Sequence, residues 1–239
     1  MSKLFVLNDP AVRELRESHP LLKNKALIGT GQFSGVFEGS RPDTVYKLSI
    51  DRASYIFHTS YLGKSDRTHF TKVIQDHGIV GRFKTSKNVV RTKLSNPREL
   101  DAPIYLYEVE KLHKIPVKTE NKLLSMRITK DWRTFDFASD QQELFHRALD
   151  VSTQIQERPY MQGQDSVLEA LLSISYFLGE YSDAFVDIHG ANMMQRANGD
   201  FVFSDPIGDL FIYNSHYTFG SVNEITPEMF ESIKSSLIG

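Results

Sequence analysis

The sequence predicts an α+β fold with two lobes, in which a small β-rich N-terminal lobe precedes a reduced helical C-terminal lobe. Segments rich in β-branched and aromatic residues gather in the first half of the chain, which is typical of strands. Apolar residues at helical spacing dominate the second half. Because strands precede helices instead of alternating with them, we expect an antiparallel sheet and a separate helical layer. The boundary is expected near residues 110–113, giving lobes of 1–110 and 111–239.

The first half begins with a helix expected over 10–17, where Asp9 is the N-cap and a proline lies in the first turn. A glycine-rich turn at 29–35 then separates the first two strands. The helical pattern over 52–62 is weak, and the polar stretch 64–88 gives no assignment. Strands are expected at 26–28, 36–39, 44–49, 88–92 and 103–109.

The second half combines helices with one hairpin. An Asn198-Gly199 turn separates Met193-Met194 from Phe201-Val202-Phe203, and Asn-Gly between apolar segments is a strong hairpin signal. The segment 165–181 is apolar around much of its circumference, so we expect a buried helix there. The helices of this half are expected at 139–156, 165–181 and 228–237.

Composition excludes several classes of protein. The chain has 239 residues, 40% of them hydrophobic and 24% charged, which suits one or two globular domains. A formal net charge of -2 gives no reason to expect direct nucleic-acid binding. The absence of cysteine excludes disulfides and thiolate metal sites. No apolar run reaches the roughly 18 residues that a membrane helix needs, and the start lacks a secretory signal, so we expect a cytoplasmic protein without membrane contact.

The pattern that carries chemistry lies in the last quarter of the chain. Asp187 is followed five residues later by Asn192, and Asp205 comes thirteen residues after that. Kinase-fold phosphotransferases use this spacing. We therefore assign Asp187 as the catalytic residue that takes the proton of the attacking hydroxyl, and Asn192 and Asp205 as ligands of Mg²⁺, which prefers oxygen. His189 is a second catalytic candidate, expected to hydrogen-bond Asp205 or a backbone carbonyl, or to touch the γ-phosphate.

The glycine-rich turn and the third strand predict an ATP site. Glycines let the backbone approach a triphosphate closely, and Lys47 is placed to bind the α- and β-phosphates. An ordinary hairpin is the alternative for the turn, and its place between two strands, with a strand lysine following, argues against that alternative. A solvated strand lysine is the alternative for Lys47. The turn residues assigned to the nucleotide are Gly29, Thr30, Gly31, Gln32, Phe33 and Ser34.

A kinase lysine usually pairs with a glutamate on the next helix. Here the acids between the third strand and residue 98 are Asp51, Asp66 and Asp76, and none is a glutamate. Asp66 lies near the usual distance and is the expected partner if the pair exists. Glu110 begins a plausible hinge between the lobes and is a further expected contact of the nucleotide.

At these residues the chain resembles the early serine/threonine protein kinases of T-seven-type bacteriophages. That family has a glycine loop ending in small residues, a V-I-K strand, and D-x-H-x-G/A-N-x-M followed by N-G-D and T/S-D-P. The resemblance covers most of the chain, but its specific part is the block from 187 to 206. The matching segments here are 29–36, 45–47, 187–194, 198–200 and 204–206.

The resemblance implies an ATP- and Mg²⁺-dependent kinase with a protein-kinase-like fold, made early in infection, that modifies host proteins in the bacterial cytoplasm. Transcription and RNA-processing machinery are the expected targets. Self-modification is also expected, with candidate sites at Ser215, Thr218 and Ser221. Phe185-Val186 stands where other protein kinases have His-Arg, so we expect no control by a phosphorylated activation loop.

Two alternatives stay open. The D-x-H-x-x-N pattern fits a small-molecule phosphotransferase of the aminoglycoside type equally well, because a histidine occurs at the same place in those enzymes. The missing glutamate partner of Lys47 fits instead a kinase-fold binding module that inhibits a host protein by occupying it.

Overall fold

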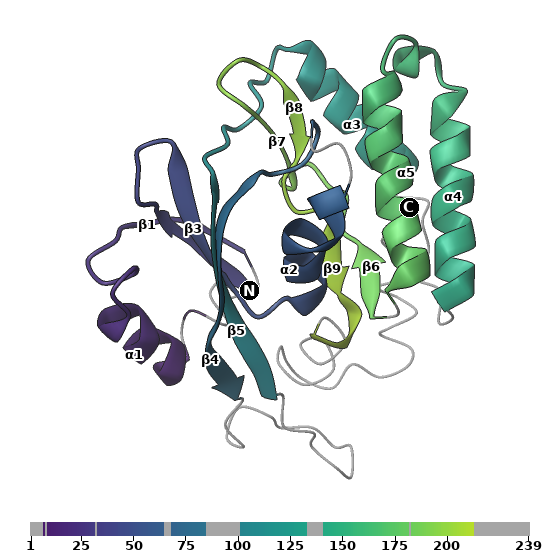
Figure 1. Ribbon diagram of the computed structural model, residues 1–239. Helices are drawn as coiled ribbons and strands as arrows, with labels where there is room; N and C mark the ends of the chain where they lie inside the picture. The colour runs from purple at the N-terminus through teal and green to yellow at the C-terminus, as the bar shows by residue number, and fades with distance from the viewer. Residues whose placement is uncertain are drawn as a thin grey trace, which may run out of the picture.

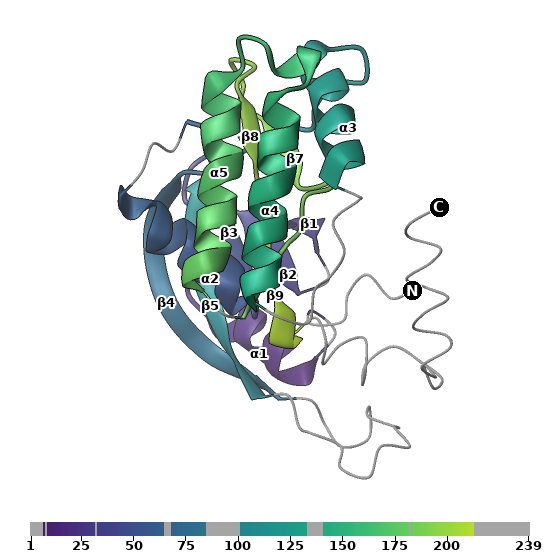
Figure 2. The ribbon, with the colours of Figure 1, turned by 90° about the vertical axis from the view of Figure 1, so that its right-hand side faces the viewer.

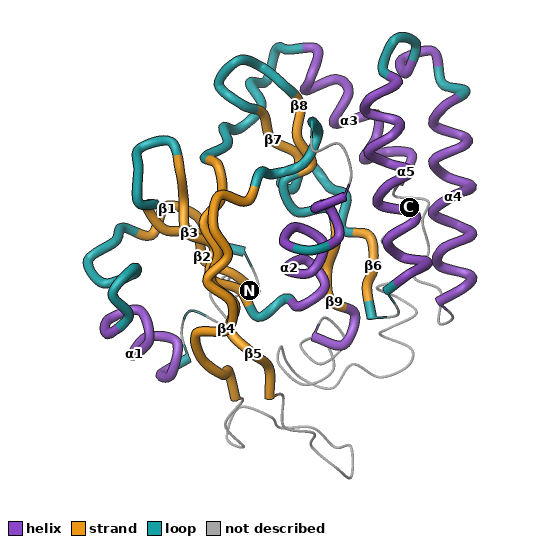
Figure 3. Tube along the Cα trace, in the orientation of Figure 1, coloured by secondary structure: helices purple, strands orange, loops and turns teal. Residues whose placement is uncertain are grey.

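The computed structural model confirms the α+β prediction. A curved sheet lies on one side, two long helices lie on the other, and helix α2 (Arg52–Thr59) stands between them (Figure 1). Strands and helices are segregated in the same way along the trace in Figure 3. The predicted strand at 88–92 and the predicted helix at 228–237 fall outside the described part of the chain. The structure describes residues 7, 9–31, 33–64, 68–84, 101–132, 141–181 and 183–212.

The sheet has five antiparallel strands in the order β1-β2-β3-β5-β4. The strands expected at 26–28, 36–39, 44–49 and 103–109 are therefore confirmed, with small changes of boundary. Their observed bounds are β1 Leu27–Thr30, β2 Ser34–Glu38, β3 Thr44–Ser49, β4 Val73–Lys84 and β5 Asp101–Glu110.

Strand β4 lies in the stretch that the sequence left unassigned. Its pairing with β5 changes register at three places, and such bulges break the alternation of buried and exposed side chains. Gly78 takes a φ of 69°, which a side chain would disfavour. The period of two that reveals a strand is therefore missing from this segment, although the edge strand itself is long and curved (Figure 2).

The two faces of the sheet bury different clusters. Helix α1 (Pro10–Ser18) covers one face, and its N-cap Asp9 accepts the backbone N–H of Ala11 at 2.9 Å, as predicted. On the other face, Tyr55 of α2 stacks on Tyr105 of β5 with ring centroids 4.1 Å apart. Helix α2 is thereby fixed against the strand that lies next to β3.

The helical layer is built from α3 (Glu120–Trp132), α4 (Gln141–Gln156) and α5 (Asp165–Glu180), with α4 and α5 side by side in both ribbon views. Helix α5 is buried as predicted: Leu171, Ile174 and Leu178 have no exposed surface. Phe57 of α2 joins this core, because its ring meets that of Phe177 edge to face at 5.1 Å. Helix α2 is thus held by the sheet on one side and by the helical core on the other.

Helix α3 was not expected from the sequence. Leu123 and Met126 are more than half exposed, whereas the polar Ser125 is buried, so its apolar residues do not mark one face. Two short 3-10 turns complete the helical structure, at Tyr61–Lys64 and Pro159–Met161. Within the described ranges, no helix has the length and apolar character needed to cross a bilayer.

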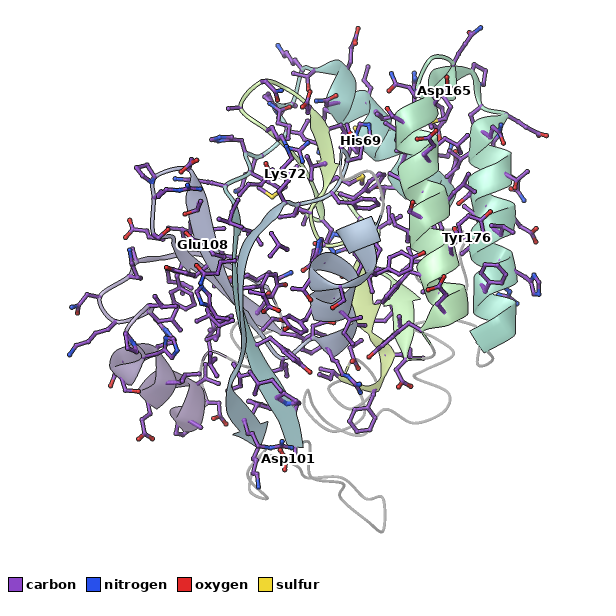
Figure 4. The ribbon with its side chains drawn as sticks, in the orientation of Figure 1. His69, Lys72, Asp101, Glu108, Asp165 and Tyr176 are labelled. Carbon is purple, nitrogen blue, oxygen red and sulfur yellow. The ribbon has the colours of Figure 1, made fainter. Side chains whose placement is uncertain are left out.

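Four short strands connect the helical layer to the sheet. They are β6 Ala184–Val186, β7 Met193–Gln195, β8 Phe201–Phe203 and β9 Ile207–Asp209, and they form two antiparallel pairs, β6 with β9 and β7 with β8. His69, labelled in Figure 4, joins β8 to the start of α5: Nδ1 lies 2.7 Å from the carbonyl of Phe201, and Nε2 lies 2.8 Å from the hydroxyl of Ser166.

Candidate active site

The two strand pairs bring two loops together. The loop between β6 and β7 carries Asp187 and Asn192, and the loop between β8 and β9 carries Asp205. The backbone N–H of Asp187 donates to the carbonyl of Pro206, and that of Ser204 donates to the carbonyl of Asn192, each at 2.8 Å. Backbone hydrogen bonds thus place the loop of the second aspartate directly beside the loop of the first.

The predicted hairpin at Asn198-Gly199 is confirmed, and it returns the chain toward Asn192. Gly199 takes a φ of 95°, which is open to glycine and strained for other residues. Within the turn, the backbone N–H of Arg196 donates to the carbonyl of Asp200, and that of Gly199 donates to the carbonyl of Arg196, each at 3.0 Å.

Both oxygens of Asp187 have a neighbour that fixes them. The amide of Asn192 donates from Nδ2 to Oδ2 of Asp187 at 2.8 Å and to the backbone carbonyl of Asp187 at 2.9 Å. Nε2 of His189 lies 3.5 Å from Oδ1 of Asp187. Burial raises the pKa of Asp187, the negative charge of Asp205 adds to the rise, and His189 and Asn192 oppose it. The arrangement holds a half-exposed carboxylate in one orientation.

Among the described residues, His189 makes neither of the two protein contacts expected from the sequence, and its expected contact with the γ-phosphate stays a prediction. The backbone N–H of Ala191 donates to Nδ1 at 3.2 Å, so the ring proton of a neutral His189 belongs on Nε2. That nitrogen faces Asp187 rather than Asp205 or a backbone carbonyl. The reason is local: the loop turns tightly, and its own N–H groups and carboxylate are the nearest partners.

Lys47 of β3 meets Asp205 across the molecule. Nζ of Lys47 lies 2.7 Å from Oδ1 of Asp205, and the lysine side chain is only 10% exposed. Burial acts to lower the pKa of Lys47, but the charge of Asp205, its hydrogen bond and the nearby Tyr107 and Asp51 together outweigh burial, so the pKa is raised. Burial acts to raise the pKa of Asp205, but the charges of Lys47 and His58 and the hydrogen bonds from Lys47 and Ser54 together outweigh burial, so the pKa is lowered. Both members of the pair are therefore charged at neutral pH.

The partner expected for Lys47 on the next helix is not an acid side chain of α2. The α2 residue that Lys47 contacts is Ser54, whose hydroxyl oxygen lies 3.4 Å from Nζ. Asp51 is buried as the N-cap of α2, and burial raises its pKa well above the ordinary value. Asp76 lies apart, bound by the hydroxyl of Tyr55 at 2.8 Å. Asp66 lies outside the described residues.

The glycine turn lies at the end of β3 where α2 begins. The backbone N–H of Gly31 donates to the carbonyl of Ser34 at 2.9 Å and closes the turn. Thr30 and Gly31 are exposed, whereas Ser34 is buried beside its partner Ser49 of β3. The side chain of Phe33 packs against the hydrophobic cluster between α1 and the sheet. It therefore does not cover the exposed backbone of the turn. Gln32 lies outside the described residues.

Glu110 forms a structural ion pair, which takes up its carboxylate. Arg196 donates from Nε to Oε2 at 2.9 Å and from Nη2 to Oε1 at 2.8 Å, while Nη2 also reaches the carbonyl of Phe70 at 2.9 Å. The backbone N–H of Lys72, labelled in Figure 4, donates to Oε1 at 2.9 Å. The backbone N–H of Glu110 donates to the carbonyl of Lys72 at 3.0 Å. The carboxylate of Glu110 thus links β5 to the β7–β8 hairpin, and the expected contact of this residue with a nucleotide stays a prediction.

Two oxygens of the predicted magnesium ligands fit a hard cation. Among the described residues, no hydrogen-bond donor reaches Oδ1 of Asn192 or Oδ2 of Asp205, because their bonds use Nδ2 and Oδ1. Mg²⁺ is commonly held by one or two such oxygens together with substrate phosphates and water. In the same part of the chain, no group of three or more His, Cys, Asp or Glu side chains is placed to bind a metal.

Sequence reasoning missed Ser54 and Arg196. Ser54 donates its hydroxyl hydrogen to Oδ1 of Asp205, although 151 residues separate them. A serine in a helix and an arginine before a turn carry no local signal, since their roles depend on partners far away in the chain. Neither protein-family models nor curated proteins give a match to this chain.

Proposed function

We propose that this protein is an ATP- and Mg²⁺-dependent serine/threonine protein kinase with a kinase-like, two-lobed fold. Its lobes would be residues 1–110 and 111–239. By its resemblance to phage early kinases, it would act on host proteins in a bacterial cytoplasm and on itself. The observation that carries the proposal is the ion pair of Lys47 with Asp205, next to the loop that fixes Asp187.

The order of parts supports this proposal. A glycine turn joins β1 and β2, the lysine lies on β3, and Ser54 of the helix that follows bonds Asp205 of the β8–β9 loop. Protein kinases place their glycine loop, strand lysine and catalytic loop in the same order. The likeness concerns the arrangement of chemical groups, and it motivates the kinase-like assignment of the fold.

Each residue has a defined part in the proposed reaction. The hydroxyl of a serine or threonine would donate a hydrogen bond to Asp187, which accepts its proton as the new bond to the γ-phosphorus forms. The bond from that phosphorus to the β–γ bridging oxygen breaks, and ADP leaves. Lys47 would bind the α- and β-phosphates, while Asn192 and Asp205 would hold the cation. A bound Mg²⁺ neutralises charge on the phosphates.

The orientation of Asp187 suits a proton acceptor. Asn192 and His189 fix the carboxylate before any substrate arrives, so little reorganisation is needed during the reaction. The raised pKa of Asp187 makes the carboxylate a better base than an exposed aspartate, provided that it is ionised at the working pH.

The test is transfer of label from γ-labelled ATP to protein, using purified protein, Mg²⁺ and a bacterial lysate. Wild type should label itself and host proteins, and Asp187→Asn should lose at least about 100-fold of the rate, the lower range for a proton-transfer residue. Asp183→Asn is the matched control, since Asp183 is exposed and uses its backbone carbonyl to bond Leu210. Equal labelling by wild type and Asp187→Asn would overturn the proposal.

Phosphoproteomics of host cells that express wild type or Asp187→Asn would then identify the substrates. If an aminoglycoside or a sugar stimulates ATP turnover and no phosphoprotein forms, the protein is a small-molecule phosphotransferase and not a protein kinase.

A binding module is the second candidate, and one observation favours it. Within the described residues no glutamate of α2 pairs with Lys47, whose charge partner is the carboxylate that a kinase gives to magnesium. A module that acts by occupancy would keep its full biological effect in an Asp205→Ala variant. A kinase would lose it.

A further inference from the structure

The first turn of α2 is tied to the strand that follows Asp205. Oδ1 of Asp51, the N-cap, accepts the backbone N–H of Ser54 at 2.8 Å. Oδ2 of the same carboxylate accepts the backbone N–H of Asp209 at 3.2 Å. Asp209 belongs to β9, so one buried side chain fixes both the start of the helix and the strand beyond the Asp205 loop.

Ser54 stands between the two charges of the site. Its hydroxyl donates to Oδ1 of Asp205 and accepts from Nζ of Lys47 at 3.4 Å. An ammonium group only donates and a carboxylate only accepts, whereas a hydroxyl does both at once. Ser54 is 1% exposed, so bulk water does not replace its hydroxyl at this place.

We propose that Ser54 is a positioning residue for Asp205, standing where a protein kinase carries its helix glutamate. This inference rests on the proposed function. When a nucleotide binds, Lys47 has to exchange Asp205 for the phosphates. The hydroxyl of Ser54 remains on Oδ1, because the first helical turn that carries it is fixed by Asp51. Oδ2 of Asp205 then stays available as a cation ligand.

The role proposed for Ser54 affects the affinity for Mg²⁺ rather than the affinity for the nucleotide. Groups that orient a metal ligand typically change metal affinity or activity about 10- to 100-fold when removed. Ser54→Ala should therefore raise the Mg²⁺ concentration needed for half-maximal phosphate transfer by about 10- to 100-fold. The KM for ATP at saturating Mg²⁺ should change little, because Lys47 keeps its access to the phosphates. A merely structural serine would alter stability without shifting the Mg²⁺ requirement.

The experiment compares Mg²⁺ titrations of wild type, Ser54→Ala, Ser54→Thr and Ser60→Ala, by phosphate transfer and by calorimetric binding of ADP. Ser54→Thr keeps the hydroxyl and should restore the wild-type requirement. Ser60→Ala is the control, since Ser60 is exposed at the other end of α2. If Ser54→Ala does not fold, Ser54→Cys replaces it, because a thiol has nearly the same shape and is a weak donor.

The outcomes separate this inference from the proposed function. A raised Mg²⁺ requirement in Ser54→Ala that Ser54→Thr reverses supports the inference. An unchanged requirement in an otherwise active protein overturns it and leaves the kinase assignment standing. If wild type neither transfers phosphate nor binds ADP in a Mg²⁺-dependent way, the proposed function and the inference both fail.

Discussion

Lys47 and Asp205 form one ion pair, but the chain holds its two members in different ways. Lys47 lies in the middle of a regular strand, paired with Val36 of β2 on one side and Tyr107 of β5 on the other. Asp205 lies in a loop between three-residue strands, where individual contacts replace a ladder. One such contact is the hydrogen bond from the hydroxyl of Thr71 to the carbonyl of Ser204, at 3.1 Å.

This difference predicts which part of the site is more sensitive to substitution. A strand is held in place by many backbone hydrogen bonds, so the replacement of one side chain leaves the position of its backbone unchanged. A loop between short strands depends on a few side chains, each with a separate role. We call β1–β5 the sheet side and residues 184–209 the loop side, and we expect substitutions on the loop side to be the more damaging.

The largest effect is expected from Asp205→Asn, which removes the charge partner of a lysine that is only 10% exposed. The free energy of unfolding should fall by about 3 kcal/mol, the lower end for a broken buried pair, because a third of the Asp205 side chain is exposed. Urea denaturation measures this change. Lys47→Met is the comparison and should cost less, because the partly exposed Asp205 that remains is hydrated more readily. A variant Asp205→Asn as stable as wild type would contradict the charged pair.

An effect of similar size is expected from Arg196→Met. Arg196 anchors the loop side to the end of β5 through Glu110, with both side chains less than one fifth exposed. The loss should lower the free energy of unfolding by about 3 kcal/mol, since a partly buried carboxylate loses its charge partner and the carbonyl of Phe70 loses a donor.

Arg82→Met on the sheet side is the matched control for that substitution. Arg82 also pairs with an aspartate, Asp101, but its side chain is 58% exposed. The free energy of unfolding of Arg82→Met should stay close to that of wild type, because exposed ion pairs contribute little to stability. Equal losses in both variants, measured by urea denaturation, would remove the distinction between the two sides.

The third prediction concerns pH and the loop that holds Asp187. In the proposed reaction Asp187 accepts the proton as an ionised carboxylate, so kcat/KM should fall as pH decreases through the pKa of Asp187. Burial raises this pKa, and His189 opposes the rise. His189→Ala should therefore move the acid limb of the profile to higher pH. His146→Ala is the control, since His146 is exposed on α4 and should leave the limb in place. A limb that moves to lower pH would exclude the proposed role of His189.

The same pKa has a consequence for stability with a definite sign. Because the folded protein binds the Asp187 proton more tightly than the unfolded chain does, this group favours folding at pH values below the ordinary carboxyl pKa. That contribution is lost as pH rises through the raised pKa. His189→Ala should extend the loss to higher pH, which urea denaturation at several pH values measures.

The smallest effect is expected at the hairpin turn. Gly199→Ala places a side chain at a φ of 95° and should cost about 1 kcal/mol of stability. Gly190→Ala, in the neighbouring loop, has open space around the new Cβ and no positive φ, so it should change stability by less than about 0.5 kcal/mol. Thermal unfolding of both variants measures the difference. Equal stabilities would show that the turn carries no strain.

The sequence by itself determined the elements whose signals are local. The strand at 44–49 is rich in β-branched and aromatic residues, the Asn198-Gly199 turn has its own conformational preference, and the spacing of Asp187, Asn192 and Asp205 can be read along the chain. Because one short hairpin separates the two acidic loops, that spacing also indicated that Asp205 returns beside Asn192. Strand β4 escaped prediction because its bulges remove the period of two that marks a strand.

Tertiary structure decided which partners meet across long stretches of chain. Ser54 and Asp205 are 151 residues apart, and Glu110 and Arg196 are 86 apart. Glu110 forms a partly buried structural ion pair because the β7–β8 hairpin places an arginine beside it, and no local sequence pattern around either residue predicts that pair. A hydroxyl on α2 stands beside Lys47 because α2 is packed between two cores, and the packing of a helix depends on every element that it touches.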